Sequence, residues 1–220
     1  MIIAIDGPAG AGKSTVARRL ALKLGFLYID TGAMYRALTY KAIEEKIDIK
    51  DSKTIIRMAA DSQIDLMNKP DGSLQISLDG RDITDLIRQP RITQLVSELA
   101  KIKEVRQIML KLQRSLGRQR DSVLDGRDIG TVVFPDADKK FYIDAEFKER
   151  VGRRYKELKE LAGGNSLEAV EKDLHNRDTI DSTREFAPLK KADDAIYIDT
   201  TKMSIEEVVE TVLKHVSAQN

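Results

Sequence analysis

Five short apolar runs recur along the chain. Most of their residues are Ile, Val, Leu, Phe or Tyr, and each run gives way within a residue or two to Asp, Thr or Gly. Stretches with helical spacing of apolar residues lie between them, an alternation typical of a doubly wound parallel sheet. The five predicted strands are 2–5, 26–29, 122–124, 140–143 and 195–198. Because the runs are apolar on both faces, we expect helices on both sides of the sheet and ligands at the carboxyl ends of the strands.

Three helices stand out from the same pattern. The helix after the first strand ends at Gly25, a residue that commonly stops helices. A longer apolar stripe predicts one continuous helix over 93–116, with Gly117 after it. The last helix begins after Ser204, where Glu207 completes the spacing of a capping box.

Between residues 62 and 90 the pattern changes to short alternating runs. They are separated by Pro70-Asp71-Gly72 and by Asp79-Gly80, which are turn sequences. We therefore predict a small antiparallel insert over 62–90. A second feature, Gly163-Gly164-Asn165, lies between two charged helical stretches and is the best candidate for a hinge.

Composition narrows the class of protein. A chain of 220 residues suits one domain, 1–220, and 37 Lys plus Arg nearly cancel 36 Asp plus Glu, giving a formal charge of +1. Such a balance does not favour nucleic acid or a membrane surface as a partner, so any anion site must be local. There is no Cys, hence no disulfide framework or thiolate zinc site. No leader segment or long apolar stretch is evident, so we expect a soluble, cytoplasmic protein.

The strongest motif follows the first strand. It has the pattern Gly, four residues, Gly-Lys-Ser, placed between a predicted strand and a predicted helix, which is the context of a P-loop. In a P-loop, backbone N–H groups cradle phosphates, the lysine neutralises the transferring group and the Ser hydroxyl binds Mg²⁺. The predicted ATP-binding residues are Gly7, Pro8, Ala9, Gly10, Ala11, Gly12, Lys13, Ser14 and Thr15.

A P-loop alone leaves kinases, GTPase switches and motor ATPases open. Asn68-Lys69-Pro70-Asp71 matches the guanine-reading motif of GTPases, but it falls in the predicted insert and contains a Pro-Asp-Gly turn. The chain also contains no Asp-x-x-Gly, the segment with which those switches sense the γ phosphate. We therefore interpret 68–71 as a turn.

The segment after the second strand carries a candidate phosphate-binding group. Asp30 and Thr31 fit a helix N-cap without any further function. Arg36 stands about one turn into the next helix, where its planar fork can grip a phosphate. The alternative for Arg36 is a solvated helix face.

The third strand ends in Asp125-Gly126-Arg127-Asp128. An acidic residue after an apolar run suits a Mg²⁺ site, which assigns Asp125 to the metal beside Ser14. Arg127 can face a phosphate, and Asp128 can accept a hydrogen bond from an exocyclic amine. The alternative is an Asp-Gly turn with incidental charges.

A last group of charged residues lies in the later part of the chain. It can form solvated faces paired with nearby glutamates. Alternatively, a lid over 148–166 brings cations to the transferring phosphoryl group on closure. These residues are Arg150, Arg153, Arg154, Arg177, Asp178, Asp181 and Arg184.

Four sequence blocks in this order resemble the bacterial cytidylate kinases, over nearly the whole chain. They are the P-loop at 7–14, Asp30-Thr31-Gly32-Ala33-Met34-Tyr35-Arg36, Asp125-Gly126-Arg127-Asp128-Ile129-Gly130-Thr131-Val132-Val133-Phe134-Pro135, and Arg184 with Ala187-Pro188-Leu189. The resemblance implies a five-stranded parallel kinase fold with a short lid and an enlarged insert beside the monophosphate site. The chain departs from the family pattern in having Thr31 in place of Ser, Ser14 in place of Gly, and Thr179, Ile180, Ser182 and Thr183 in a stretch that is often more charged.

The resemblance also implies residue roles. Ser97, Arg106 and Asp128 match positions that recognise cytosine, Asp181 and Arg184 match positions that hold the sugar, and Arg36 and Arg127 match phosphate contacts. Together with the motifs, it predicts ATP-dependent phosphorylation of CMP or dCMP with Mg²⁺. The predicted catalytic cations are Lys13, Arg127, Arg153 and Arg154, with Thr31 and Arg177 as further acceptor-binding residues.

The expected partners are therefore small molecules, CMP and dCMP, for a protein that binds neither nucleic acid nor membrane and acts as a monomer. A kinase for UMP or shikimate remains the alternative among enzymes, and a P-loop switch or regulatory binding module the alternative from another class.

Overall fold

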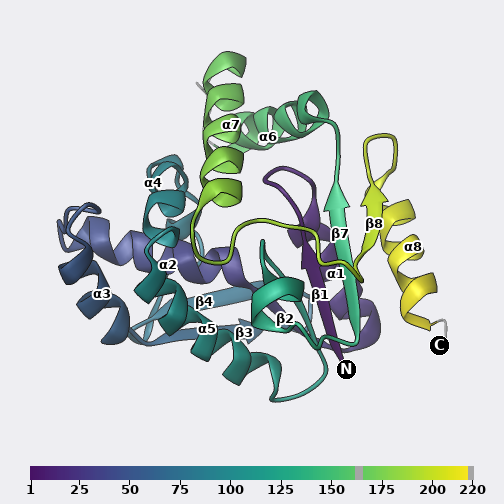
Figure 1. Cartoon of the computed structure of the whole chain (residues 1–220), viewed down its shortest axis with the longest axis horizontal. Helices are drawn as coiled ribbons and strands as arrows, with labels where there is room; N and C mark the ends of the chain where they lie inside the picture. Colours follow the sequence, from purple (N-terminus) through teal and green to yellow (C-terminus); the bar gives the residue numbers. More distant parts are fainter. Residues whose placement is uncertain (162–165, 218–220) are drawn as a thin grey trace.

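The computed structural model describes residues 1–161 and 166–217, with the predicted hinge at 163–165 outside the described residues. A five-stranded parallel sheet forms the centre, in the order β2-β6-β1-β7-β8 (Figure 1). The strands are β1 (Ile2–Asp6), β2 (Leu27–Asp30), β6 (Ser122–Asp125), β7 (Lys139–Asp144) and β8 (Ile196–Asp199). All five predicted runs are thus strands, and the predicted fold class is confirmed.

Each of these five strands ends in an aspartate at the carboxyl edge of the sheet. In the register, Asp125 of β6 lies between Ile5 of β1 and Asp30 of β2. The chain order of the strands reverses on either side of β1, and ligands of open α/β sheets bind where such a reversal occurs. A ligand-binding site is therefore expected at the edge above β1, β6 and β2.

Helices cover both faces of the sheet, as the apolar strands predicted. Helix α1 (Lys13–Leu24) packs on β2 and β6 and also contacts α8 (Ile205–Ser217), whereas α5 (Lys103–Gly117) covers β2 and β6 from the other side (Figure 1). Gly25 ends α1 with φ 69°, and the Phe26 N–H closes the turn on the Ala21 carbonyl at 2.9 Å. The capping box at α8 is also present, with Ser204 and Glu207 bonded to each other.

The predicted continuous helix over 93–116 is wrong. The segment forms two helices, α4 (Pro90–Ala100) and α5, separated at Lys101 and Ile102. Ile102 is extended, with ψ 115°, and the Ala100 carbonyl at the end of α4 accepts a hydrogen bond from Arg106. No Gly or Pro marks this break, and the apolar stripe continues through it, so the pattern concealed it.

The insert predicted at 62–90 is a three-stranded antiparallel sheet. It comprises β3 (Ile64–Asn68), β4 (Leu74–Leu78) and β5 (Arg81–Asp82), followed by the short turn η1 (Leu86–Arg88). The Asn68 side chain donates to the Tyr28 carbonyl and accepts from the Tyr28 N–H, which ties the insert to β2. The Gly72 N–H donates to the Lys69 carbonyl, so 68–71 ends a strand and begins a turn, as interpreted from the sequence.

Two helices stand above the carboxyl edge of the sheet, α6 (Phe147–Leu161) and α7 (Leu167–Thr183) (Figure 1). The predicted lid, 148–166, coincides largely with α6. The small core between α6 and α7 includes Val151 and Leu174, and Ala9 of the P-loop packs into it. The remaining helices, α2 (Thr31–Glu44) and α3 (Ser52–Ala60), lie on the insert side of the molecule.

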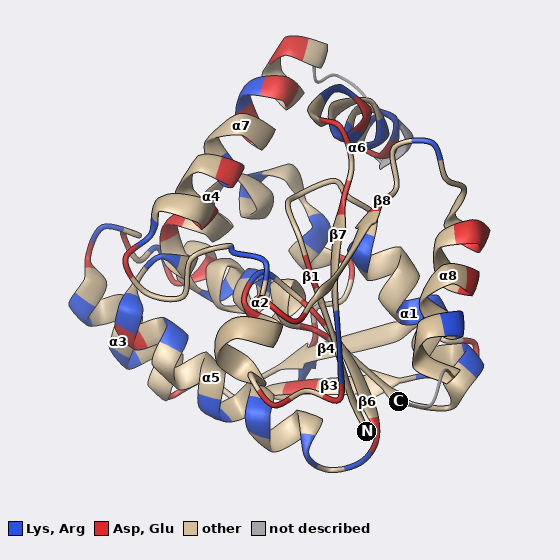
Figure 2. Ribbon diagram, turned by 45° about the vertical axis from the view of Figure 1, so that its right-hand side comes forward, with Lys and Arg blue, Asp and Glu red and all other residues tan. Residues whose placement is uncertain are grey.

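Charged residues of both signs are spread over the helices, in keeping with the net charge of +1 (Figure 2). Among the described residues, no helix combines the length and the apolar character that crossing a bilayer requires.

Two glycines in helices give a matched test of packing. A Cβ at Gly117, in the last turn of α5, would lie 2.7 Å from Cζ of the fully buried Phe134. Gly117→Ala should therefore lower the free energy of unfolding by roughly 1–3 kcal/mol through overpacking. A Cβ at Gly152 in α6 meets no atom of the described residues within 4 Å, so Gly152→Ala should leave the free energy of unfolding unchanged or raise it slightly. Urea titrations measure both, and equal effects would contradict this packing.

Candidate functional site

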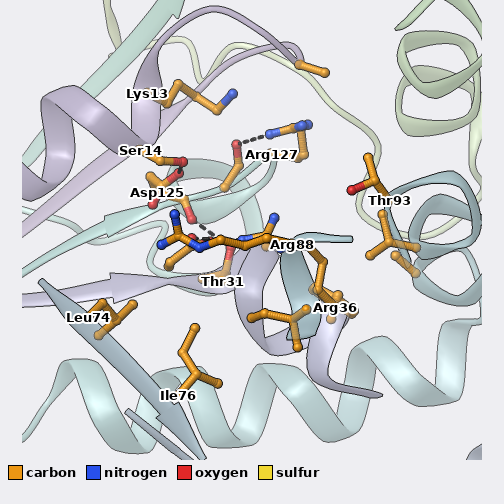
Figure 3. Close-up of a pocket in the computed structure, with 18 of the residues that line it drawn as sticks. Lys13, Ser14, Thr31, Arg36, Leu74, Ile76, Arg88, Thr93, Asp125 and Arg127 are labelled. Atoms are coloured by element: carbon orange, nitrogen blue, oxygen red, sulfur yellow. Dashed lines mark hydrogen bonds and ion pairs between the residues drawn. The ribbon is translucent and has the colours of Figure 1, made fainter. Parts of the chain in front are cut away.

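One cavity of about 620 Å³ opens above β1, β6 and β2. It extends from the P-loop to the insert, α4, α5 and α7. Ten Lys or Arg and six Asp or Glu line it, an excess of four positive charges that suits anionic ligands. In the view of Figure 3, Lys13 and Ser14 lie on one side of the cavity, Thr93 of α4 lies on the other, and Arg127 lies between them.

The P-loop begins where β1 ends. Gly7 has φ 145°, and a Cβ there would lie 1.9 Å from the Ile143 carbonyl oxygen, so no other residue fits this turn. The Lys13 side chain is 5% exposed, and its ammonium donates to the Pro8 carbonyl at 2.6 Å. Burial, helped by the charge of Arg127, lowers the pKa of Lys13 to about 7. A bound polyphosphate would favour its charged form.

Ser14 and Asp125 meet beside the P-loop. The Ser14 hydroxyl donates to Asp125 Oδ2 at 2.7 Å, and the Tyr28 hydroxyl donates to Oδ1 at 2.9 Å. Burial and the nearby Asp30 raise the pKa of Asp125 to about 6. A cation placed here would reverse that shift. Among the described residues, no cluster of three His, Cys, Asp or Glu side chains forms a closed metal cage. A hydroxyl with one carboxylate suits Mg²⁺, which takes its other ligands from phosphates and water.

The middle of the cavity carries the residues predicted for phosphate. Arg36 forms a 2.9 Å ion pair with Asp30, which also accepts from the Ala33 N–H as the N-cap of α2. The Thr31 hydroxyl donates to the Asp125 carbonyl at 2.7 Å, so it braces the loop after β6. Thr31 and Arg36 both line the cavity.

A chain of alternating charges forms the far end of the cavity. Arg106 lies 2.6 Å from Asp128, and Asp128 lies 3.6 Å from Arg184. Arg184 lies 3.3 Å from Asp181, which in turn pairs with Arg127 at 2.8 Å. Burial would raise the pKa of Asp181, but Arg127 and Arg184 outweigh it and hold that pKa below its usual value.

This network retains donors that no described group of the protein satisfies. Within residues 1–161 and 166–217, Nε of Arg106 and Nη2 of Arg184 are buried without a hydrogen-bond partner. Buried donors without partners are costly, and a ligand with acceptor atoms would remove that cost. Ser97 is buried at the same end, and the Arg106 guanidinium lies over the Tyr35 ring, 5.2 Å from its centroid.

The break between α4 and α5 explains how Ser97 and Arg106 come to line the same cavity. Nine residues correspond to about two and a half turns, so one continuous helix would place these two side chains on opposite faces. Because α4 ends at Ala100 and α5 begins at Lys103, both residues line the same cavity.

Comparison with known proteins identifies the family. The sequence profile of the family described as "Cytidylate kinase" matches residues 3–218. A "Cytidylate kinase" of Clostridioides difficile (strain 630) is 51% identical over 99% of this chain and 98% of its own. Another, of Alkaliphilus oremlandii, is 52% identical over 96% of this chain and 95% of its own. The chain belongs to the cytidylate kinase family. Its resemblance in four sequence blocks is thereby confirmed.

The fold of this cytidylate kinase family member is shared more widely. A solved shikimate kinase from Bacteroides thetaiotaomicron covers 99% of both chains with a TM-score of 0.50 and 10% identity. At that identity the likeness concerns the P-loop kinase fold and not the acceptor.

The predicted lid arginines differ in where their side chains lie. Arg154 and Arg177 line the cavity, and the Nε of each is buried without a partner in the part of the chain that the structure describes. Burial, together with Arg127, lowers the pKa of Arg177 to about 10. Arg153 points elsewhere, because its guanidinium pairs with Glu149 and donates to Thr200. Its predicted catalytic role remains a prediction that this arrangement does not support directly.

Arg150 and Asp178 hold the lid helices to the P-loop. Arg150 donates to the Ala9 carbonyl at 2.9 Å, and Asp178 accepts from the Ala9 N–H at 3.2 Å. The two side chains also pair with each other at 2.5 Å. The sequence left Arg150 and Asp178 open between a solvated face and a group that the lid brings to the site, whereas in the structure they brace the P-loop itself.

Sequence reasoning missed several groups in this cytidylate kinase family member. Tyr28 reads as a strand residue, yet its hydroxyl meets Asp125. Arg88 lines the cavity from the end of the insert, and nothing in the sequence besides its charge indicated a place in the site. Asp6 ends β1, is buried, and accepts hydrogen bonds from two backbone N–H groups. No motif or periodicity marks any of the three.

Proposed function

We propose that this protein transfers the γ-phosphoryl group of ATP to CMP or dCMP, giving ADP and CDP or dCDP. The observation that carries the proposal is a single cavity with a P-loop at one end and the Arg106–Asp128–Arg184 group at the other. Membership of the cytidylate kinase family supports the same acceptor.

The acceptor base suits the far end of the cavity. Cytosine presents an amine that donates and a ring nitrogen that accepts. The Asp128 carboxylate can accept from the amine, while Arg106 keeps a buried donor free for the ring. Asp181 and Arg184 lie beside this pair, where the sugar would follow the base.

The phosphates of the two substrates would meet in the middle. Arg36 and Arg127 are placed to hold the acceptor phosphate, and Lys13 with the P-loop N–H groups to hold the donor. The attacking phosphate oxygen is already largely ionised at neutral pH, so the chemistry needs no dedicated general base. Catalysis then consists of positioning the two groups in line and stabilising the charge that develops, with no covalent enzyme intermediate.

The Ser14 hydroxyl and the Asp125 carboxylate are the groups that would hold Mg²⁺, directly or through water. When bound, the ion neutralises charge on the donor phosphates. The tyrosine hydroxyl on the other oxygen of Asp125 fixes the orientation of that carboxylate.

The lid remains part of the proposal. Arg154 and Arg177 project from α6 and α7 into the cavity, which supports a role as cations around the transferring group. We further propose that the enzyme acts as a monomer. We expect that monomer to act in the cytoplasm.

A coupled assay of ADP formation across acceptors tests the proposal. CMP and dCMP should support steady turnover, with UMP, AMP, GMP and shikimate slower by at least about tenfold in kcat/KM. The control is the same reaction without acceptor. ADP production that needs no acceptor would indicate a P-loop ATPase or switch, and preference for shikimate or UMP would reassign the far end of the cavity.

Separate parts of the cavity are proposed for the acceptor phosphate and for ATP, which gives a further prediction. Arg36→Ala and Arg127→Ala should each raise the dissociation constant of CMP about tenfold or more, because each loses a charge-assisted phosphate contact. The dissociation constant of ATP should change by less than about threefold. Isothermal titration measures both, with Arg57→Ala, an exposed arginine outside the cavity, as the control. Equal losses for the two nucleotides would show that the division is wrong.

A further inference from the structure

A single wide helical turn, η2 (Ile129–Val133), follows Asp128 directly. The Asp128 carbonyl accepts from the Val132 N–H at 2.9 Å and from the Val133 N–H at 3.1 Å. The backbone of Asp128 is therefore part of this turn, and whatever holds the turn also places the carboxylate that faces Arg106.

The first end of η2 is held by Asp6. The two Asp6 oxygens accept from the Ile129 N–H at 2.8 Å and from the Gly130 N–H at 2.7 Å. Asp6 is 4% exposed and comes from β1, more than a hundred residues away in the chain. A Cβ at Gly130 would lie 3.1 Å from Lys140 Cδ and 3.4 Å from Asp6 Oδ2, so the approach is close.

The second end of η2 is held by Arg114. Its Nε donates to the Val133 carbonyl at 2.8 Å, and its Nη2 donates to the Val132 carbonyl at 2.9 Å. Arg114 belongs to α5, the helix that also supplies Arg106 to Asp128. It does not line the cavity, so it has no substrate to contact.

We propose that Asp6 and Arg114 are positioning residues for acceptor recognition, holding the two ends of η2 and thereby fixing the Asp128 carboxylate between Arg106 and Arg184. The inference rests on the proposed function, since Asp128 is the group that reads the base. It assigns specificity to two side chains that touch neither nucleotide.

The test uses Arg114→Met, which keeps the length of the side chain but removes both hydrogen bonds. It should raise KM for CMP about tenfold and lower the ratio of kcat/KM for CMP to that for UMP about fivefold or more. The kcat and the KM for ATP should stay within about twofold. Arg114→Lys, which keeps the charge but only one donor nitrogen in place of the two that bond the turn, should recover part of the loss.

Arg118→Gln is the matched control. Arg118 is exposed at the end of the same helix and lies over the Phe134 ring, 6.0 Å from its centroid, but donates to no carbonyl of the turn. It should leave the KM for CMP and the CMP-to-UMP ratio unchanged. Asp6→Asn tests the first end of η2. It should also lower the ratio of kcat/KM for CMP to that for UMP, because the Asn amide presents a donor to a backbone N–H.

A double variant separates positioning from a general loss of stability. If Arg114 acts through Asp128, its effect on the CMP-to-UMP ratio should vanish in an Asp128→Asn background. Additive losses, or equal losses of kcat/KM for CMP, UMP and ATP in Arg114→Met, would overturn the inference. If the unmodified protein phosphorylates neither CMP nor dCMP, the proposed function fails and takes the inference with it. If the unmodified protein prefers CMP to UMP and Arg114→Met keeps the same ratio of kcat/KM, the inference is refuted while the proposed function stands.

Discussion

Replacing Lys13 with alanine is expected to lower kcat by at least about a hundredfold, the range seen when a group that stabilises a developing charge is lost. Lys13 opens α1 within the P-loop and is buried at the donor end of the cavity. Its ammonium bonds to the loop's own Pro8 carbonyl, so the group is already held close to where the β and γ phosphates would lie. The KM for ATP should change less than kcat, because the backbone N–H groups of the loop still hold the phosphates.

Two further variants make the Lys13 experiment specific. Lys13→Met keeps the aliphatic stem without the charge and should be as slow as Lys13→Ala, whereas loss of packing alone would make the alanine variant worse. Lys23→Ala removes an exposed lysine of the same helix and should turn over normally. Initial rates at saturating ATP and CMP give kcat for each protein. Near-normal turnover of Lys13→Ala would remove the assignment of the P-loop as the donor site.

The arrangement of the fold was largely predictable from local patterns. Strands apolar on both faces, such as 2–5 and 122–124, and the P-loop between a strand and a helix are specified within a few residues. The break at Lys101 and Ile102 was not predictable in this way. The Ala100 carbonyl at this break accepts a hydrogen bond from the Arg106 side chain, and no helix-stopping residue marks the break in the sequence.

In the candidate site, too, residues that belong to a local motif were predictable, and residues whose roles depend on contacts between distant segments were not. The lysine and serine of the P-loop were recognisable because phosphate chemistry requires them at fixed spacing. Ser97 and Arg106 came only from resemblance to a family, since their place in one cavity depends on the break between α4 and α5. Asp6 and Tyr28 carry polar groups inside strands that look purely structural, so their bonds to Gly130 and Asp125 became visible only in three dimensions.

Base choice depends most directly on Asp128. Cytosine presents a donating amine where uracil presents a carbonyl, and the adjacent ring nitrogen accepts in cytosine but carries an N–H in uracil. The Asp128 carboxylate is nearly buried, with Arg106 2.6 Å from one oxygen and Arg184 3.6 Å from the other. A carboxylate has about four lone-pair directions, so both arginines can fix it while one direction stays open to the amine. Facing uracil, the same oxygen would meet a carbonyl and remain unpaired.

Asp128→Ala should therefore reduce kcat/KM for CMP by roughly thirtyfold to several thousandfold, the cost of removing one partner of a buried charge pair. The loss for UMP should be less than about tenfold, which narrows the ratio between the two acceptors, and the affinity for ATP should hardly change. Because alanine also leaves Arg106 and Arg184 without their carboxylate, unfolding transitions must be recorded alongside. Asp128→Asn keeps the volume and can turn its amide to suit either base, so it should narrow the ratio with a smaller loss of stability. If kcat/KM for CMP and UMP keeps its original ratio in both variants, cytosine is read elsewhere, and Ser97 and Arg106 become the residues to replace next.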